Sequence, residues 1–278
     1  MGALGPKSLS VALGLCAVAC ANAPAPAPIA IQASQPETRP APALPEQSVV
    51  SSERSTCATS GGAEPIQLPA RSESSADNLR AWVFALAGPE LRGREAGTND
   101  SKRAARSIAD YFQAIGAAPP DDSGYCRAFS GEGYRDQNVI AHLPPSPPDC
   151  GWIVLGAHYD AHGIDSSGTV RPGADDDATG IAVMLEVARL VVTGKRRPRP
   201  GLVLAAFGAE EKGLVGSQAY VSSPTIPLDR VALMVNVDMA GRKPGGKYPS
   251  IGWEPFGPNR RSTAALVRTA AERVQVGA

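Results

Sequence analysis

The sequence lacks a net charge of either sign, and it lacks several common functional motifs. Its 27 Lys and Arg residues balance its 27 Asp and Glu residues, whereas proteins that bind nucleic acids usually carry a basic surplus or patch. One basic run, KRRPRP at 195–200, directly precedes an apolar segment, and we interpret it as a solvated loop. The G-x-S-x-G motif of serine hydrolases and any internal repeat are also missing. These absences argue against a nucleic-acid partner and against a serine nucleophile of that type.

The sequence also lacks an apolar run long enough for a confident membrane span. Residues 1–23 contain one lysine, a short apolar stretch and then small residues, which is the pattern of a secretory signal. The stretch AVAC resembles a bacterial lipoprotein box in which Cys20 is lipidated, and we favour it over the signal-peptidase site ANA at 21–23. Both interpretations predict export, to the periplasm, to the cell envelope as a lipoprotein, or into the medium. Membrane contact is expected only through the lipid anchor.

A change of composition divides the remaining chain. Residues 24–76 are rich in Pro, Ala, Ser, Gln and Glu and contain few large apolar residues, so they cannot bury enough surface to fold alone. Stretches such as PAPAP favour an extended, semi-rigid chain. We therefore predict a disordered tether over 24–76 and a folded domain over 77–278, which is long enough for a substantial core.

Strand and helix patterns alternate along the folded part. Short apolar runs bounded by turn residues predict strands at 137–143, 152–157, 201–208 and 231–238. Helical patterns occupy 98–116, 179–192, 213–221 and 259–275. The strands are apolar throughout, as in a sheet that is covered on both faces. The order of elements predicts an α/β sandwich around a mostly parallel sheet.

The five cysteines do not have the spacing of a zinc knuckle. Cys126 and Cys150 flank the strand predicted at 137–143, and export favours oxidised thiols. We therefore predict a disulfide between Cys126 and Cys150. Two free buried thiols are the alternative.

Acidic residues and one histidine gather where the predicted strands end. They are His158 and Asp160, the run Asp175, Asp176 and Asp177, the pair Glu210 and Glu211, and Asp238. In α/β sheets, sites form outside the carboxyl ends of the strands. Each cluster alone has another explanation, because an acid such as Asp177 can cap a helix. Together they place one imidazole and several carboxylates at one edge, where they would repel one another unless a cation neutralised them.

These residue types indicate a metal-dependent hydrolytic site. Imidazole and carboxylate ligands suit zinc, with manganese or cobalt as substitutes, and an aspartate can bridge two ions. The side chains of Glu210 and Glu211 cannot easily point the same way, so one can bind metal while the other faces the substrate. The implied chemistry is attack on a polarised carbonyl by a metal-activated water, with the free glutamate as base.

Four stretches in this order resemble the motifs of a known family. They are GAHYD at 156–160, PGADDDATGIAVMLEVARL at 172–190, FGAEEKGLVGSQAYV at 207–221 and VNVDMAG at 235–241, and LRGREAGT at 91–98 resembles the family's N-terminal signature. The sequence is similar to the co-catalytic zinc exopeptidases, the twenty-eighth metallopeptidase family, which includes leucyl-type aminopeptidases, glutamate carboxypeptidase-like proteins and glutaminyl cyclases. The resemblance implies a three-layer α/β/α sandwich and a mostly parallel mixed sheet of the zinc-exopeptidase (phosphorylase/hydrolase-like) type.

The resemblance also implies two zinc ions and a role for each matching residue. In these roles His158 and Asp238 bind the first zinc, Asp176 bridges both, Glu211 binds the second, Glu210 is the general base and Asp160 orients His158. It further implies a cis peptide bond between Asp176 and Asp177.

The second zinc site departs from the family pattern. The family supplies a late histidine several tens of residues beyond the position of Asp238, and this sequence has three histidines in all. His142 falls inside a predicted strand and His162 just after His158, and we expect both to be loop or surface residues. We therefore expect the domain to be incomplete at its C-terminus, with one complete zinc site.

Three functions fit these observations. We favour an exported zinc exopeptidase acting on peptide substrates, most simply as an aminopeptidase, because the Glu-Glu pair and the Asp-rich loop are intact. The alternatives are a single-zinc acyltransferase similar to glutaminyl cyclase and a non-catalytic ectodomain on a tether.

Overall fold

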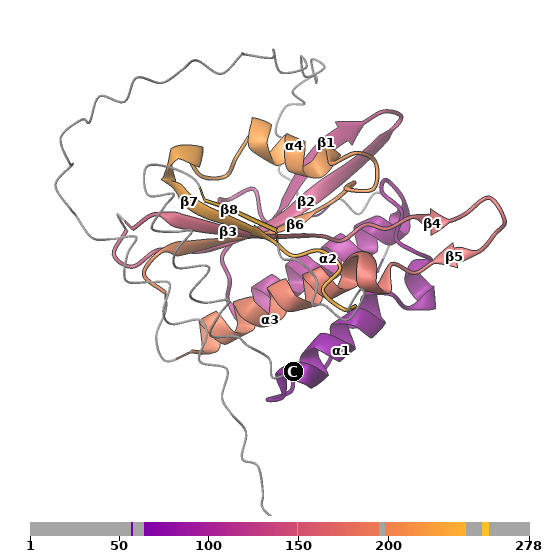
Figure 1. Cartoon of the computed structure of the whole chain (residues 1–278), viewed down its shortest axis with the longest axis horizontal. Helices are drawn as coiled ribbons and strands as arrows, with labels where there is room; N and C mark the ends of the chain where they lie inside the picture. The colour runs from indigo at the N-terminus through magenta and orange to yellow at the C-terminus, as the bar shows by residue number, and fades with distance from the viewer. Residues whose placement is uncertain (1–56, 58–63, 149, 195–197, 243–251, 256–278) are drawn as a thin grey trace, which may run out of the picture.

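The computed structural model describes residues 57, 64–148, 150–194, 198–242 and 252–255. Within them, six strands form one sheet in the order β1-β2-β6-β3-β7-β8, and two short strands, β4 and β5, form a separate hairpin (Figure 1). Three predicted features lie outside the described residues: the N-terminal signal, lipidation at Cys20 and the helix at 259–275.

Four α-helices are described, and three of them confirm predicted helices. The helices are α1 (Ser75–Leu86), α2 (Asn99–Ile115), α3 (Thr179–Thr193) and α4 (Val215–Ser222). Short helical turns are η3 (Pro89–Leu91), η4 (Ala174–Ala178) and η5 (Leu228–Arg230). The Thr98 side chain accepts the N–H of Ser101 to begin α2, and Gly116 ends it with a left-handed φ of 82°. No described helix has the length and apolar content that a membrane crossing requires.

The sheet is parallel only at its centre. Its strands are β1 (Cys126–Gly131), β2 (Tyr134–Leu143), β3 (Trp152–His158), β6 (Gly201–Phe207), β7 (Val231–Asn236) and β8 (Gly252–Pro255), and the hairpin strands are β4 (Gly163–Ile164) and β5 (Val170–Arg171). β3 pairs in parallel with β6 and β7, whereas the β1–β2, β2–β6 and β7–β8 pairs are antiparallel. The sheet is therefore mixed, as expected, but it is not mostly parallel, because only two of its five strand pairs are parallel among the described residues. The tight turn between β1 and β2 can join only antiparallel strands.

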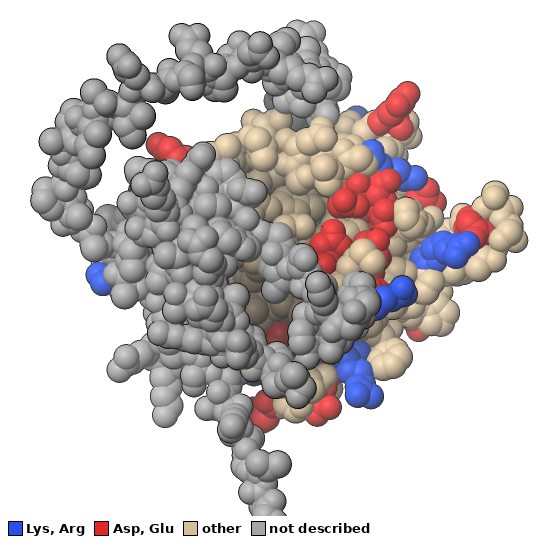
Figure 2. Space-filling view, in the orientation of Figure 1, with Lys and Arg blue, Asp and Glu red and all other residues tan. Residues whose placement is uncertain are grey.

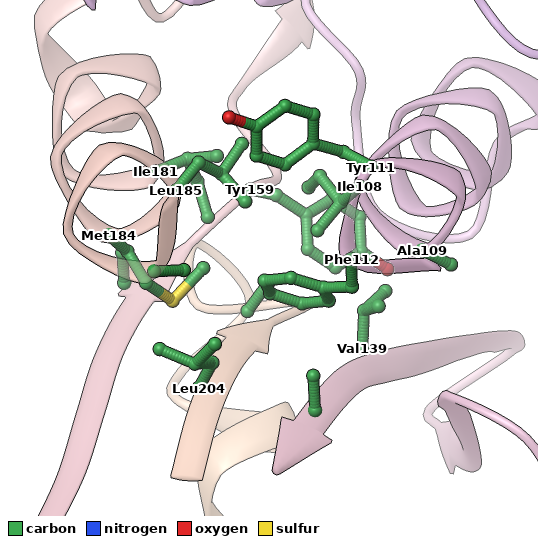
Figure 3. Close-up of a cluster of buried hydrophobic side chains, with 14 of the residues drawn as sticks. Ile108, Ala109, Tyr111, Phe112, Val139, Tyr159, Ile181, Met184, Leu185 and Leu204 are labelled. Carbon is green, nitrogen blue, oxygen red and sulfur yellow. The ribbon is translucent and has the colours of Figure 1, made fainter. Parts of the chain in front are cut away.

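Helices cover both faces of the sheet, which confirms the three-layer sandwich. In Figure 1, α1, α2 and α3 lie on one face and α4 on the other. Alternate residues of β6 serve the two sides: Leu204 belongs to the core under α2 and α3, while Val203 and Phe207 pack with Tyr220 of α4. Figure 3 shows the larger core, in which Ile108 and Phe112 of α2 and Ile181, Met184 and Leu185 of α3 meet over Val139 and Leu204.

The end of the predicted tether packs on the domain. Ile66 is buried, and its N–H donates to the Ser107 hydroxyl of α2 at 3.0 Å. α1 begins at Ser75, two residues before the predicted boundary. Amino-acid composition indicates only whether a segment can form a core of its own. This segment instead packs against apolar surface that α2 and α3 provide, which its composition does not predict.

The predicted Cys126–Cys150 disulfide is wrong, because Cys126 is bonded to Cys57. The sheet register aligns Cys126 with Val139 of β2 and, through β6, with Ala157 of β3. Three strand spacings of about 4.8 Å separate β1 from β3, and Cys150 lies seven residues before Ala157 along the chain. A disulfide needs Cα atoms within about 7 Å. The register therefore places Cys150 out of reach of Cys126.

His142 should make the protein less stable in mild acid. It is buried in β2, with Nε2 2.9 Å from the Thr225 hydroxyl, and burial, with the charge of Arg127, lowers its pKa to about 4. The unfolded chain takes up this proton near pH 6.5. The free energy of unfolding therefore keeps the full contribution of the neutral His142 above pH 6.5. It falls by about 3 kcal/mol as the pH drops to 4.

Urea unfolding of the wild type and of His142→Gln at pH 7, 5 and 4 checks this expectation. The variant should lose this part of the pH dependence, since glutamine does not titrate. An identical slope in the two proteins would show that His142 does not contribute.

Candidate metal centre

Three parallel strands end at the same edge of the sheet, and each delivers a polar residue there. His158 is the last residue of β3, Glu210 follows β6 and Asp238 follows β7. The turn η4, which contains Asp176, leads into α3 beside them. Acidic side chains gather on this part of the surface, next to the β4–β5 hairpin (Figure 2). The parallel centre of the sheet thus brings together residues that are up to 80 positions apart in the sequence.

Three carboxylates converge on the imidazole of His158. Nε2 of His158 lies 3.0 Å from Oδ1 of Asp176, 3.8 Å from Oδ1 of Asp238 and 3.9 Å from Oε2 of Glu210. The His158 side chain is 2% exposed, whereas Asp176 and Asp238 are each 41% exposed. The buried imidazole therefore faces an open side lined with carboxylates.

The surrounding carboxylates shift the pKa values of the residues in this site. Burial would lower the pKa of His158, but the carboxylates of Asp160, Asp238 and Asp177 raise it to about 11. The contact with His158 lowers the pKa of Asp238. Burial raises the pKa of Glu210, and the nearby carboxylates add to this effect. The same carboxylate charges that raise the pKa of His158 would favour a metal cation at this position.

Asp177 is fully buried and supports the site through the backbone. Its Oδ1 accepts the N–H groups of Gly180 at 2.8 Å and Met239 at 3.2 Å, and its Oδ2 accepts the N–H of His158 at 3.3 Å. A side chain at Gly180 would collide with this carboxylate. Asp177 therefore ties the end of β3, the start of α3 and the chain after β7 together.

The structure offers two aspartates as partners of His158. Potential ligand atoms of His158, Asp177 and Asp238 all lie within 4.8 Å of one another, and they form the one such group found among the described residues. Asp176 has the shortest contact to Nε2 and an exposed carboxylate, whereas Asp177 already accepts three backbone donors. We therefore keep Asp176 as the metal-binding candidate. The peptide between Asp176 and Asp177 is cis, as predicted.

Asp160 holds the two glutamates in place. It is fully buried, and its two carboxylate oxygens accept the N–H of Glu210 at 3.0 Å and of Glu211 at 3.2 Å. Its Oδ1 also lies 3.6 Å from Nδ1 of His158, which is longer than a hydrogen bond. The predicted orientation of His158 by Asp160 stays a prediction, and the contacts to the Glu-Glu backbone are a support that sequence reasoning missed.

Glu211 occupies a second part of the site with His162. Oε2 of Glu211 lies 3.3 Å from Nε2 of His162, and its Oε1 is buried without a hydrogen-bond partner among the described residues. His162 is 64% exposed, as expected for a loop residue, but its ring faces the site. His142, in contrast, is buried in β2 with its Nε2 against the Thr225 hydroxyl, so the expectation that it is a loop or surface residue is wrong.

Arg94 lies under the site and is fully buried. Its guanidinium donates to the carbonyl oxygens of Tyr159 at 2.6 Å, Leu86 at 3.0 Å, Pro172 at 2.6 Å and Gly173 at 2.7 Å. It thereby connects the chain between His158 and Asp160 with the loop before η4. Sequence reasoning missed this role, although Arg94 is in the LRGREAGT stretch at 91–98.

The donor set fits divalent zinc. It consists of one buried imidazole, carboxylates within 4 Å of its Nε2, and a buried oxygen of Glu211 that lacks a partner among the described residues. Imidazole and carboxylate are established zinc ligands. The fold and the site together define a carboxylate-rich candidate metal centre at the carboxyl edge of an α/β sheet.

Comparison with known proteins identifies the family. The profile of Peptidase family M28, a family of zinc metallopeptidases, matches residues 138–276, about half of the chain. The chain belongs to this family. A probable zinc metalloprotease of Leptosphaeria maculans is 33% identical over 152 residues, covering 51% of this chain and 33% of the relative. The uncharacterized protein YfbL of Escherichia coli is 32% identical over 178 residues, covering 59% of this chain and 51% of that protein.

These relatives are longer than the matched region, and the chain spans about half or less of their length. Among solved structures, a Zn-dependent exopeptidase from Parabacteroides distasonis has a TM-score of 0.50 at 22% identity and covers 64% of each chain. A glutaminyl cyclase from Tannerella forsythia also has a TM-score of 0.50, at 21% identity, and covers 62% of this chain and 63% of its own. These likenesses confirm the α/β fold.

Proposed function

We propose that the chain is an exported zinc-dependent exopeptidase, an aminopeptidase that hydrolyses peptide bonds with Glu210 as general base. One observation carries the proposal. Nε2 of the buried His158 has three carboxylates within 4 Å, and the last of these, Glu210, is adjacent to a second metal-binding candidate, Glu211. The aminopeptidase part follows the resemblance of the motifs to the leucyl-type enzymes.

Two zinc ions are part of the proposal. His158, Asp176 and Asp238 would hold the first ion, and Asp176 and Glu211 would contribute to the second. When bound, zinc polarises a substrate carbonyl and lowers the pKa of a water molecule. Asp160 and Asp177 would act through other residues, because both are buried and accept backbone N–H groups around the site.

Glu210 is placed to move a proton. Its side chain is 30% exposed, so water and substrate can reach it, and its Oε2 lies 3.9 Å from Nε2 of His158. Asp160 fixes the Glu210 backbone through the N–H contact of 3.0 Å. A general base needs this combination of access, fixed position and a pKa raised toward the working pH. Burial and the nearby carboxylates supply the last condition.

The export part of the proposal rests on the sequence pattern of residues 1–23. The Cys57–Cys126 disulfide supports it, because structural disulfides persist in oxidising compartments outside the cytoplasm. In this arrangement Cys20 would carry a lipid anchor, and the Pro-rich segment after it would hold the domain away from the membrane.

Zinc content and reaction products test the proposal together. The purified full chain should contain zinc and should release one free amino acid from the N-terminus of an unblocked peptide. The N-acetylated form of the same peptide is the control and should stay intact. Pyroglutamate from a peptide with N-terminal glutamine would favour the cyclase alternative, and folded protein without zinc would contradict the proposal.

A further inference from the structure

We propose that Thr179 is a positioning residue of the metal centre, which fixes the position of Asp238 relative to Asp176. Its hydroxyl connects the segment that contains Asp176 with the chain that directly follows Asp238. The inference rests on the proposed function, because Asp176 and Asp238 are two ligands of the proposed first zinc ion. Thr179 itself would act only through these two residues.

Side chains of one segment bind three consecutive backbone N–H groups of another. Both segments carry a proposed ligand, because residues 175–179 include Asp176 and residues 239–241 directly follow Asp238. The hydrogen bonds are Met239 N–H to Oδ1 of Asp177 at 3.2 Å, Ala240 N–H to the Thr179 hydroxyl at 2.9 Å and Gly241 N–H to Oδ1 of Asp175 at 2.9 Å. Residues 239–241 are partly exposed, so water could satisfy their N–H groups, and the three side-chain acceptors instead hold the segment in place.

Thr179 has the central place in this arrangement, because its hydroxyl is used twice. It donates to the carbonyl oxygen of Asp175 at 2.7 Å and accepts the N–H of Ala240 at 2.9 Å. Asp175 directly precedes Asp176, and Ala240 lies two residues after Asp238. One short side chain therefore sets the separation of the two backbone segments that carry the two ligands.

The two ligand carboxylates depend on their backbone for their positions. The side chains of Asp176 and Asp238 are each 41% exposed, so packing restricts them little. On one side of Asp238, the N–H of the buried Val237 donates to the Gly156 carbonyl at 2.9 Å. On the other side, Met239 has a left-handed φ of 53°, which a residue other than glycine keeps only where its surroundings impose it. The hydrogen bonds to residues 239–241 supply such surroundings.

Gly241 shows how closely the two segments approach each other. A methyl group on Gly241 would lie 2.7 Å from Cγ2 of Thr179 and 2.8 Å from Oδ1 of Asp175, so a larger residue must displace one segment from the other. Gly241 is not among the glycines with a positive φ, so its backbone would accept alanine. Gly241→Ala therefore disturbs the same contact from the opposite side.

A local role at the start of α3 is the competing explanation. Threonine hydroxyls in helices commonly bond to the carbonyl oxygen four residues earlier, and the bond from Thr179 to Asp175 has this spacing. Thr193 makes the same bond at the other end of α3, to the Arg189 carbonyl at 2.9 Å. A local role predicts that both threonines affect stability alone. A positioning role predicts that Thr179 alone affects zinc affinity.

Zinc titration of the metal-free full chain against a coloured chelator distinguishes the two explanations. Thr179→Val keeps the shape of the side chain without the hydroxyl, Thr179→Ser restores the hydroxyl, and Thr193→Val is the matched control. None of these substitutions changes the charge of the site. Urea unfolding verifies that each variant is fully folded in the titration, where a change in stability alone leaves the zinc affinity unchanged. Hydrogen exchange of the metal-free protein reports on residues 239–241 directly.

Thr179→Val and Gly241→Ala should bind zinc at least about tenfold more weakly than the wild type, the usual loss when a residue that orients a metal ligand is removed. Their amides at 239–241 should exchange faster without metal. Thr179→Ser should recover most of the affinity, and Thr193→Val should match the wild type.

Wild-type zinc affinity in folded Thr179→Val, or an equal loss in Thr193→Val, would overturn the inference and leave the proposed function intact. If Thr179→Val does not fold, Gly241→Ala decides by the same criterion. A folded wild type that binds no zinc would overturn the inference and the proposed function together.

Discussion

Glu210→Gln should lower kcat for peptide hydrolysis by about 10²- to 10⁴-fold while zinc content stays unchanged. Glutamine is nearly isosteric but cannot accept the proton, and the loss of a general base has effects of this size. The backbone N–H contact to Asp160 does not depend on the side chain, so the fold and the metal ligands should persist. Steady-state kinetics and elemental analysis of the same preparation measure both quantities.

The pH profile adds a second readout. Burial raises the pKa of Glu210, and the charges of Asp160, Asp238 and Asp176 raise it further, against the effect of His158. Since a base works when deprotonated, wild-type activity should fall as the pH drops through this raised pKa, and that acid limb should be missing from the residual activity of Glu210→Gln.

Glu90→Gln is a suitable control. The Glu90 carboxylate is 74% exposed, and its surface ion pair with Arg103 is long, at 3.9 Å, so the substitution should change little. It should retain wild-type kinetics. Full activity in Glu210→Gln would remove Glu210 from the mechanism. Loss of zinc in that variant would instead make Glu210 a ligand and shift the role of base to another residue.

The centre of the fold could be predicted from local patterns. The helix α2 has clear periodicity, and the strands β2, β3, β6 and β7 are short apolar runs between turns. Because β3, β6 and β7 are parallel, the rule that sites form at carboxyl ends placed His158, Glu210 and Asp238 together correctly. Convergence of these side chains follows from strand direction alone.

The parts that failed depend on contacts between distant segments. The partner of Cys126 is set by the position of β1 at the sheet edge and by an N-terminal segment that packs back on the domain. α1 was missed because most of its residues stay partly exposed, and only Asn78, Trp82 and Leu86 are buried. Neither spacing nor composition carries this information.

The supporting residues of the site were equally hidden in the sequence. His162 was set aside because it does not occupy the place of the family's late histidine, yet the turn after β3 directs its ring toward Glu211. Arg94 lies 64 residues before His158, and only the fold shows that its side chain passes under the site. Both are single polar residues that do not directly follow a predicted strand, so the strand and helix patterns of the sequence do not predict their positions in the site.

Arg94→Met should be the most destabilising substitution considered, at about 3–5 kcal/mol, the range for breaking a buried charged network. Methionine fills much of the volume but leaves the carbonyl oxygens of Tyr159, Pro172 and Gly173 without their donor, at about 1–3 kcal/mol for each unsatisfied group. It also removes a fully buried cation whose charge interacts with that of Asp160.

Arg92→Met is the matched control. Arg92 is two residues away and 61% exposed, and its ion pair with Asp100 at 2.8 Å lies at the surface, so its loss should cost less than about 1 kcal/mol. Urea unfolding of metal-free protein at pH 7.5 compares the two variants with the wild type. Equal midpoints for Arg92→Met and Arg94→Met would contradict the role assigned to Arg94.

Arg94→Lys separates charge from hydrogen bonding. Lysine keeps the positive charge, but its single ammonium cannot reach carbonyl oxygens on both sides as the planar guanidinium does. If the hydrogen bonds hold the site together, Arg94→Lys should resemble Arg94→Met in stability and both should bind zinc more weakly than the wild type. If charge compensation dominates, Arg94→Lys should retain most of the stability. The burial of Arg94, which lowers its pKa to about 10, and its four carbonyl partners in three separate segments favour the first outcome.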